Sequence, residues 1–219
     1  MEIFLVRHGQ TGGNVARRHQ TEHTELSFVG EQQVREVAEQ IKQYEPTHLV
    51  TSSLVRAVET ARVIGQECGL VPETNSRFIE LVKPNFLFGH YHWSIKSLWF
   101  YMQWYMGKDT DSSTGGESYN DLLKRFESTK EYLTQYPSDA RIVVVSHTFF
   151  INLFVAHLCR DKTLGPLSAM LAFKKLLTMP NTDVIKICFS SEVDDGICAW
   201  SVDNHLETSS DSGNIVPPV

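Results

Sequence analysis

The sequence lacks the features that would place it in a membrane, on nucleic acid or among domains stapled by disulfides. Its longest apolar-looking stretch, 94–106, contains Lys96 and Gln103 and is too short to span a bilayer. The 26 acidic residues outnumber the 20 basic ones, which argues against nucleic acid as a partner. The four cysteines have no C-x-x-C spacing, and no basic or apolar leader precedes the first apolar run. We therefore expect a cytoplasmic protein with reduced thiols and no membrane contact.

What the sequence does contain is enough apolar residues for one sizeable core. Hydrophobic side chains make up 42% of its 219 residues, which fits a single domain. We expect this domain to span 1–206, with an insert at 86–106 that is unusually rich in aromatic residues. The polar segment 207–219 is expected to be a disordered tail.

Strand and helix patterns alternate along the chain. Short apolar runs predict strands at 3–6, 48–51, 141–146, 184–189 and 197–202, and Asp195-Gly196 predicts a hairpin turn between the last two. Apolar residues three and four apart predict helices that begin near Ser27, Ser52 or Ser53, Ser118 and His147. The pattern predicts an α/β fold, a three-layer sandwich with a mostly parallel central sheet and an antiparallel strand near the C-terminus.

Polar residues directly follow the apolar strands. Arg7 and His8 follow the first strand, Arg56 lies in a helix after the second, and His147 follows the run 141–146. Because ligands of open α/β sheets bind at the carboxyl ends of the strands, we expect these side chains to converge on an anion such as a phosphoryl group. The alternative is that each belongs to an unrelated salt bridge. Glu80, a lone carboxylate among apolar residues, is a candidate to join them.

The motifs around these residues resemble the histidine phosphatase superfamily, which has the phosphoglycerate-mutase-like fold. The segment 7–11, together with Asn14, is similar to its R-H-G signature. Further similarities follow in the same order at Leu26-Ser27-x-x-Gly30-x-x-Gln33, Ser53-x-x-Arg56-Ala57-x-x-Thr60-Ala61, Gly116-Glu117-Ser118, Val145-Ser146-His147 and Asn181-Thr182. An ordered set that spans nearly the whole chain is far more specific than the R-H-G tripeptide alone.

The resemblance implies a histidine acid-type phosphatase that hydrolyses a phosphorylated small molecule without a metal or another cofactor. It implies that His8 is the nucleophile and that Glu80 and His147 complete the catalytic set. The residues that would bind the phosphate are Arg7, Asn14, Arg56, His147 and Thr148. A neutral imidazole is a good nucleophile, and nearby arginines should disfavour its protonation.

Two features leave alternatives open within the site. Phe149 and Phe150 stand where the family usually has glycine after the second histidine, so we expect them to narrow the pocket. Glu117 is the alternative proton donor, although its place in Gly116-Glu117-Ser118 favours a structural or phosphate-adjacent role. His90 and His92 are spaced like metal ligands, but no cysteine or carboxylate cluster completes a site, which favours packing or substrate contact.

Two other functions are kept as alternatives. A phosphoglycerate-type mutase would return the phosphoryl group to a second hydroxyl, but the loop 15–24 and the run Ser146-His147-Thr148 lack the segments typical of such mutases. A phospholigand-binding protein without turnover is suggested by Phe149-Phe150 and the aromatic insert. The insert is expected to pack in the core or to support a homodimer, and a lid over the site is the weaker alternative.

Overall fold

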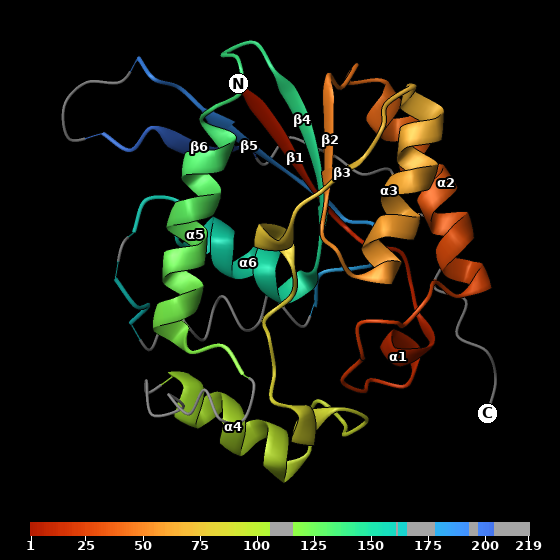
Figure 1. Ribbon diagram of the computed structural model, residues 1–219, viewed down its shortest axis with the longest axis vertical. Helices are drawn as coiled ribbons and strands as arrows, with labels where there is room; N and C mark the ends of the chain where they lie inside the picture. Colours follow the sequence, from red (N-terminus) through yellow and green to blue (C-terminus); the bar gives the residue numbers. More distant parts are fainter. Residues whose placement is uncertain (106–115, 161, 166–177, 193–196, 204–219) are drawn as a thin grey trace.

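The described part of the chain folds around one mixed sheet with helices on both faces (Figure 1). The computed structural model describes residues 1–105, 116–160, 162–165, 178–192 and 197–203. Its strands are β1 (Glu2–Arg7), β2 (His48–Thr51), β3 (Glu73–Thr74), β4 (Arg141–Ser146), β5 (Val184–Phe189) and β6 (Trp200–Asp203). Its helices are α1 (Gly12–Val15), α2 (Phe28–Lys42), α3 (Val55–Cys68), α4 (Ile95–Tyr105), α5 (Tyr119–Leu133) and α6 (Thr148–Ala156), with 3₁₀ turns η1 (Ser76–Phe78) and η2 (Asn85–Leu87).

The six-stranded sheet has the order β3-β2-β4-β1-β5-β6. Strands β3, β2, β4 and β1 pair in parallel, whereas β5 runs antiparallel to both β1 and β6. In Figure 1, α2 and α3 cover one face of the sheet, and α5 and α6 cover the other. The predicted three-layer α/β sandwich with an antiparallel strand near the C-terminus is therefore confirmed.

The two central strands are buried on both faces, which explains their unbroken apolar sequences. In β1, Phe4 and Val6 pack in the core cluster beneath α2 and α3, while Ile3 and Leu5 pack in the cluster beneath α5 and α6. The parallel register pairs Arg7 with Ser146. The residues that follow β1 and β4 therefore emerge side by side at one edge of the sheet.

Most predicted elements are present, and the differences are local. The strands predicted at 48–51, 141–146 and 184–189 match β2, β4 and β5, whereas β6 begins later than predicted, at Trp200. The 3₁₀ turn η1 precedes Glu80, and it begins where the Asn75 side chain accepts the backbone N–H of Arg77. The predicted turn at Asp195-Gly196 and the predicted tail at 207–219 lie outside the described residues.

In α4, the helix of the aromatic insert, the apolar residues that recur at helical spacing are exposed, and the aromatic residues off that face are buried. Ile95, Leu98, Trp99 and Met102 fall at helical spacing on one face of α4, and all four are exposed. Phe100 and Trp104 are buried instead. The Trp104 indole N–H donates to the carbonyl of Glu117, and its ring packs on Tyr119. Contacts with the start of α5 thus outweigh the helical periodicity of α4.

The expectation of four reduced thiols is wrong. Cys159 and Cys198 form a disulfide, with Cα atoms 5.6 Å apart and a sequence separation of 39. No sequence motif marks this pair, because it is the sheet that brings the segment before β6 next to the segment after α6. Cys68 and Cys188 are free. Among the described residues, no helix has both the length and the apolar character that crossing a membrane requires.

Candidate active site

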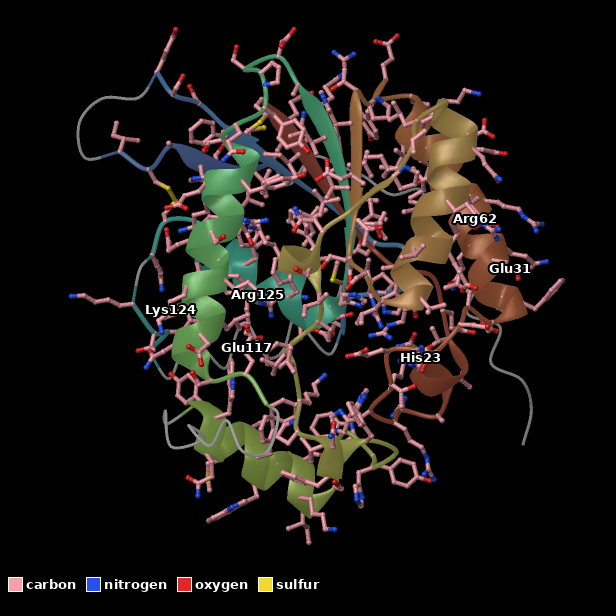
Figure 2. The ribbon with its side chains drawn as sticks, in the orientation of Figure 1. His23, Glu31, Arg62, Glu117, Lys124 and Arg125 are labelled. Atoms are coloured by element: carbon pink, nitrogen blue, oxygen red, sulfur yellow. A yellow bond between two sulfur atoms is a disulfide. The ribbon has the colours of Figure 1, made fainter. Side chains whose placement is uncertain are left out.

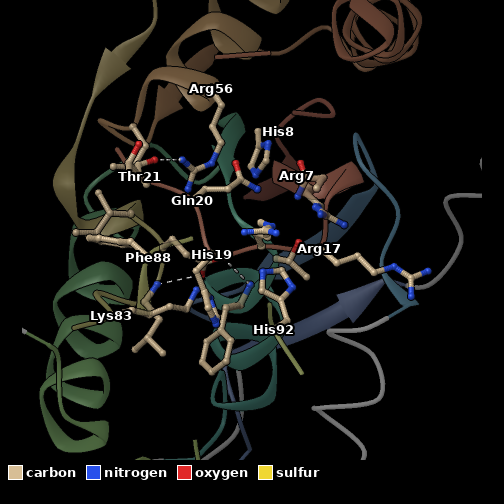
Figure 3. Close-up of a pocket in the computed structure, with 18 of the residues that line it drawn as sticks. Arg7, His8, Arg17, His19, Gln20, Thr21, Arg56, Lys83, Phe88 and His92 are labelled. Carbon is tan, nitrogen blue, oxygen red and sulfur yellow. Dashed lines mark hydrogen bonds between the residues drawn. The ribbon is translucent and has the colours of Figure 1, made fainter. Parts of the chain in front are cut away.

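A cavity of about 820 Å³ opens where β1 and β4 end (Figure 3). Six of the residues predicted to form the site line this cavity: Arg7, His8, Asn14, Arg56, Glu80 and Thr148. These residues come from five separate parts of the chain. The convergence predicted from the strand-end rule is therefore present in the structure.

His8 is held in one orientation by its own backbone. Its Nδ1 lies 2.7 Å from the carbonyl oxygen of Gly9, so Nδ1 carries the proton and donates, and Nε2 keeps its lone pair. The side chain is buried, and burial is the first cause that lowers its pKa well below the usual value of 6.5, followed by the charges of Arg56 and Arg7. His8 is therefore a neutral imidazole, with desolvation adding to the predicted effect of the arginines.

The turn that carries His8 is fixed by two of the other motifs. The backbone N–H of Gly9 donates to the Thr60 hydroxyl, and that of Gln10 donates to the Gln33 side chain, both at 3.1 Å. Gly30 packs so closely that a Cβ there would lie 2.1 Å from the carbonyl oxygen of Gln10. The spacing of glycine and glutamine in helix α2 thus reflects the support of this turn.

Two guanidinium groups flank His8, that of Arg56 buried and that of Arg7 partly buried. Arg7 donates to the carbonyl of Met179, and Arg56 donates to that of Thr21 at 3.0 Å. The Nε atom of each is buried and lacks a hydrogen-bond partner within the described part of the chain. Burial lowers the pKa of Arg7 to about 10, against the opposing effect of Glu80. Both arginines stay charged at neutral pH, and a dianion in the cavity would offset the cost of their burial.

His147 lies behind His8 rather than on the cavity wall. The two ring centroids are 5.1 Å apart, and the His147 side chain is fully buried. Its Nε2 lies 2.7 Å from the hydroxyl of Ser52, so Ser52 contacts His147 and Leu54 takes the predicted N-cap position of α3. Burial, Arg56 and His8 lower the pKa of His147 well below 6.5. The predicted second histidine is thus a neutral neighbour of the first.

Asn14 is held by its amide oxygen. This oxygen accepts the backbone N–H of Thr11 at 3.1 Å and a side-chain N–H of Asn181 at 3.3 Å. Asn181 also donates to the carbonyl of His8. The amide NH₂ of Asn14 is the part of the side chain that remains to donate to an anion.

The carboxylate of Glu80 is oriented by the start of helix α6. It accepts the backbone N–H groups of Leu81 at 3.0 Å and of Phe150 at 3.1 Å. His147, the N-cap residue of α6, makes no capping bond with its side chain, so Glu80 takes over this function from another part of the chain. Its charge acts on Arg7 and Arg56 across the cavity.

The whole set of motifs matches one family. Residues 3–191 match the pattern of the histidine phosphatase superfamily (branch 1). The chain belongs to this superfamily. The resemblance predicted from the ordered motifs is confirmed.

Named histidine phosphatase relatives include mutases and phosphatases. The chain is 29% identical over 170 residues to the probable phosphoglycerate mutase GpmB of Yersinia enterocolitica, covering 72% of this chain and 74% of that protein. It is 31% identical over 165 residues to the protein of the same name from Photorhabdus laumondii, covering 71% and 73%. The solved structure of a mycobacterial glucosyl-3-phosphoglycerate phosphatase with VO3 is 26% identical, with a TM-score of 0.70 over 92% of this chain and 96% of that chain. The superfamily supports phosphoryl transfer as the general chemistry of this chain.

In this member of the histidine phosphatase superfamily, Glu117 has a structural position. It does not line the cavity and instead forms a nearly buried ion pair with Arg125, with N–O distances of 2.6 and 2.8 Å. Glu117 and Arg125 lie next to each other in Figure 2. Arg125 also donates to the carbonyls of Arg77 and Ile79, just before Glu80. The structural reading of Glu117 therefore fits better than the alternative of a proton donor.

The two phenylalanines after His147 have different surroundings. Phe149 lines the cavity, and its ring stacks on Tyr101 with centroids 5.7 Å apart. Phe150 is fully buried and packs against Phe126 and Phe154 on the core side. Of the two, only Phe149 narrows the cavity, so the expectation is correct for one of the two residues.

Sequence reasoning missed part of the cavity wall. His19 and Lys83 line the cavity next to His92, which was predicted as a packing or substrate contact, whereas His90 does not line it. The loop with Arg18 pairs with the segment at Tyr91 through an isolated β-bridge. The basic run 17–19 was the available signal, but nothing in the sequence shows that it crosses the aromatic insert. Within the described ranges, no group of three or more histidine, cysteine or acidic side chains is placed to hold a metal.

Proposed function

We propose that this protein is a metal-independent phosphomonoesterase that works through a phosphohistidine on His8. The observation that carries the proposal is the neutral His8 imidazole, with Nδ1 fixed on Gly9 and two guanidinium groups beside it. A bare nitrogen next to paired cations suits attack on a dianionic phosphoryl group.

In the first step, Nε2 of His8 attacks phosphorus in line with the leaving oxygen. The N–P bond forms as the P–O bond to the leaving group breaks, and the leaving oxygen takes its electron pair and a proton from the Glu80 carboxyl group. Arg7, Arg56 and the Asn14 amide stabilise the charge on the other phosphoryl oxygens. His147 fixes the His8 ring by packing against it.

In the second step, water releases the phosphoryl group. Glu80, now a carboxylate, takes a proton from water as the oxygen attacks phosphorus, and the N–P bond returns its electron pair to Nε2. The products are the alcohol and inorganic phosphate, and both His8 and Glu80 return to their starting states.

The test is hydrolysis of an aryl phosphate in the presence of a chelator, by wild type and by His8→Ala. We expect full wild-type turnover in chelator and a loss of at least about a thousandfold in kcat for His8→Ala. Equal rates would remove His8 from the mechanism. If a broad phosphoester panel gives no hydrolysis while phosphate raises the melting temperature, the protein is a binding member of the family instead.

A phosphoglycerate-type mutase is the second candidate, because the two GpmB relatives are named probable phosphoglycerate mutases. A mutase must keep water from the phosphohistidine and return the phosphoryl group to a second hydroxyl. Incubation with 2- and 3-phosphoglycerate separates the two functions. Interconversion without release of phosphate would favour the mutase.

A further inference from the structure

Lys83 is a cation of the cavity wall without a counter-ion. It is half-buried and lines the cavity, and its ammonium forms no hydrogen bond or ion pair with any residue of the described ranges. Its Nζ lies 5.8 Å from the centroid of the Phe149 ring. Burial lowers the pKa of Lys83, against the opposing effect of Glu80. An unpaired ammonium in this position favours an anionic ligand.

When a phosphomonoester is bound and ready to react, the ammonium group of Lys83 has no negative charge opposite it in the cavity. Arg7 and Arg56 match the two negative charges of a phosphoryl dianion. Glu80 is the acidic side chain whose charge acts on Lys83, yet Glu80 must hold a proton to protonate a leaving group. In the reactive complex that carboxyl is neutral. The other acidic residue of the described wall, Glu22, is exposed and is not among the charges that act on Lys83, so Lys83 is left without a counter-ion.

Two neutral histidines form the wall next to Lys83. His19 is buried, and burial followed by the charges of Lys83 and His92 lowers its pKa to about 3. Its ring lies 4.6 Å from that of His92, and its Nε2 lies 2.9 Å from the Ser97 hydroxyl. In Figure 3, Lys83, His19 and His92 lie on one side of the cavity, and Arg7, His8 and Arg56 lie on the other. Arg17 and Arg18 also line the cavity, but both are exposed. Lys83 is thus the half-buried charged group on the side away from the phosphoryl clamp.

We propose that Lys83 determines specificity by binding a second anionic group of the substrate, a carboxylate or a second phosphate on the leaving-group side. This inference rests on the proposed function and narrows the substrate to small, doubly anionic phosphomonoesters. His19 and His92 carry no positive charge, and the arginines next to His19 in the chain, Arg17 and Arg18, are exposed to solvent, so Lys83 is the half-buried cation that can discriminate. Its charge would act on the part of the substrate that departs, in contrast to the arginines that hold the phosphoryl group.

The test compares substrates that differ in the second group. The carboxylate arm pairs glycerol 3-phosphate with 3-phosphoglycerate and glucose 6-phosphate with 6-phosphogluconate, and the phosphate arm pairs fructose 6-phosphate with fructose 1,6-bisphosphate. We expect wild type to prefer the doubly anionic member of at least one pair in kcat/KM. Lys83→Met should reduce that preference about 10- to 100-fold, the range expected for a charge-assisted hydrogen bond. Lys83→Arg should retain part of it.

The control is Lys96→Met, which removes an exposed lysine of α4 that does not line the cavity. It should leave every preference unchanged. The singly anionic member of each pair reports on the chemistry, so a general loss of rate in Lys83→Met does not count as support. The inference would be overturned if wild type had the same kcat/KM for both members of every pair, or if its preference for the doubly anionic member persisted in Lys83→Met. If no substrate turns over, the proposed function fails, and calorimetric Kd ratios of the same pairs on wild type and Lys83→Met decide the inference separately.

Discussion

The carboxylate of Glu117 receives two N–H groups of Arg125 at 2.6 and 2.8 Å, in a place where both side chains are nearly buried (Figure 2). The same guanidinium donates to the carbonyl of Ile79 at 2.7 Å. Because Ile79 precedes Glu80 in the chain, the ion pair holds in place the backbone that carries the proposed proton donor. Glu117 and Arg125 are thus positioning residues.

Replacing Arg125 by methionine should destabilise the fold and slow the reaction. The change leaves the Glu117 carboxylate nearly buried without its partner, which costs about 3 kcal/mol in the free energy of unfolding. Urea unfolding measures this cost, and kcat measures the displacement of Glu80. The control is Lys124→Met, whose ion pair with Asp121 is largely exposed, with side-chain exposures of 79% and 59%. That variant should lose less than about 1 kcal/mol. Similar losses in both variants would contradict the positioning role.

Gly30→Ala should disturb the turn that holds His8. Its Cβ would lie 2.1 Å from the Gln10 carbonyl oxygen, so the backbone of the turn must shift. We expect a loss of about 1–3 kcal/mol in the free energy of unfolding, together with a drop in kcat. Gly12→Ala is the matched control, because a Cβ at Gly12 meets no atom within 4 Å. A Gly30→Ala variant with wild-type kcat would show that the turn does not need this close contact.

The central strands and the residues that follow them could be predicted from sequence because their signals are local. The apolar runs of β1 and β4 mark strands buried on both faces, and the polar residues after them mark the site. The orientation of α4 could not be predicted, since both of its faces are apolar and only contacts with Glu117 and Tyr119 decide which is inward. The same limit applies to Lys83 and the Cys159–Cys198 pair, whose surroundings depend on how distant segments pack.

The buried histidines should make stability depend on pH. The pKa values of His8 and His147 are lower in the folded protein than in the unfolded chain. As pH falls below about 6.5, the unfolded chain takes up protons that the folded protein does not, so the free energy of unfolding decreases. Above that pH the contribution is fully present. Below about pH 6.5, each such histidine lowers the free energy of unfolding by about 1.4 kcal/mol for each pH unit.

The variant His147→Gln removes one of these contributions. Between about pH 6 and pH 5, its free energy of unfolding should fall less steeply than that of wild type, by about 1.4 kcal/mol per pH unit. Above about pH 7.5 the difference between the two proteins should not change with pH, which serves as the internal control. Parallel curves across the acidic range would mean that His147 is protonated in the folded protein.

The Cys159–Cys198 disulfide should be detectable in the number of free thiols and in the free energy of unfolding. Under denaturing conditions without reductant, Ellman titration should find two free thiols, Cys68 and Cys188. A Cys159→Ser/Cys198→Ser double variant should lose about 3–4 kcal/mol, the chain-entropy contribution of a bridge with a sequence separation of 39. Cys68→Ser is the control and should change stability little. Four titratable thiols would contradict the bridge.

The central claim is that the phosphoryl group passes through His8. Rapid quenching of the enzyme with a ³²P-labelled phosphomonoester, followed by peptide mapping, tests it most directly. The account predicts an acid-labile, base-stable label on the peptide that contains His8, formed and lost at rates that support turnover, and no label in His8→Gln. Turnover without a labelled protein, or a label that persists in His8→Gln, would contradict it.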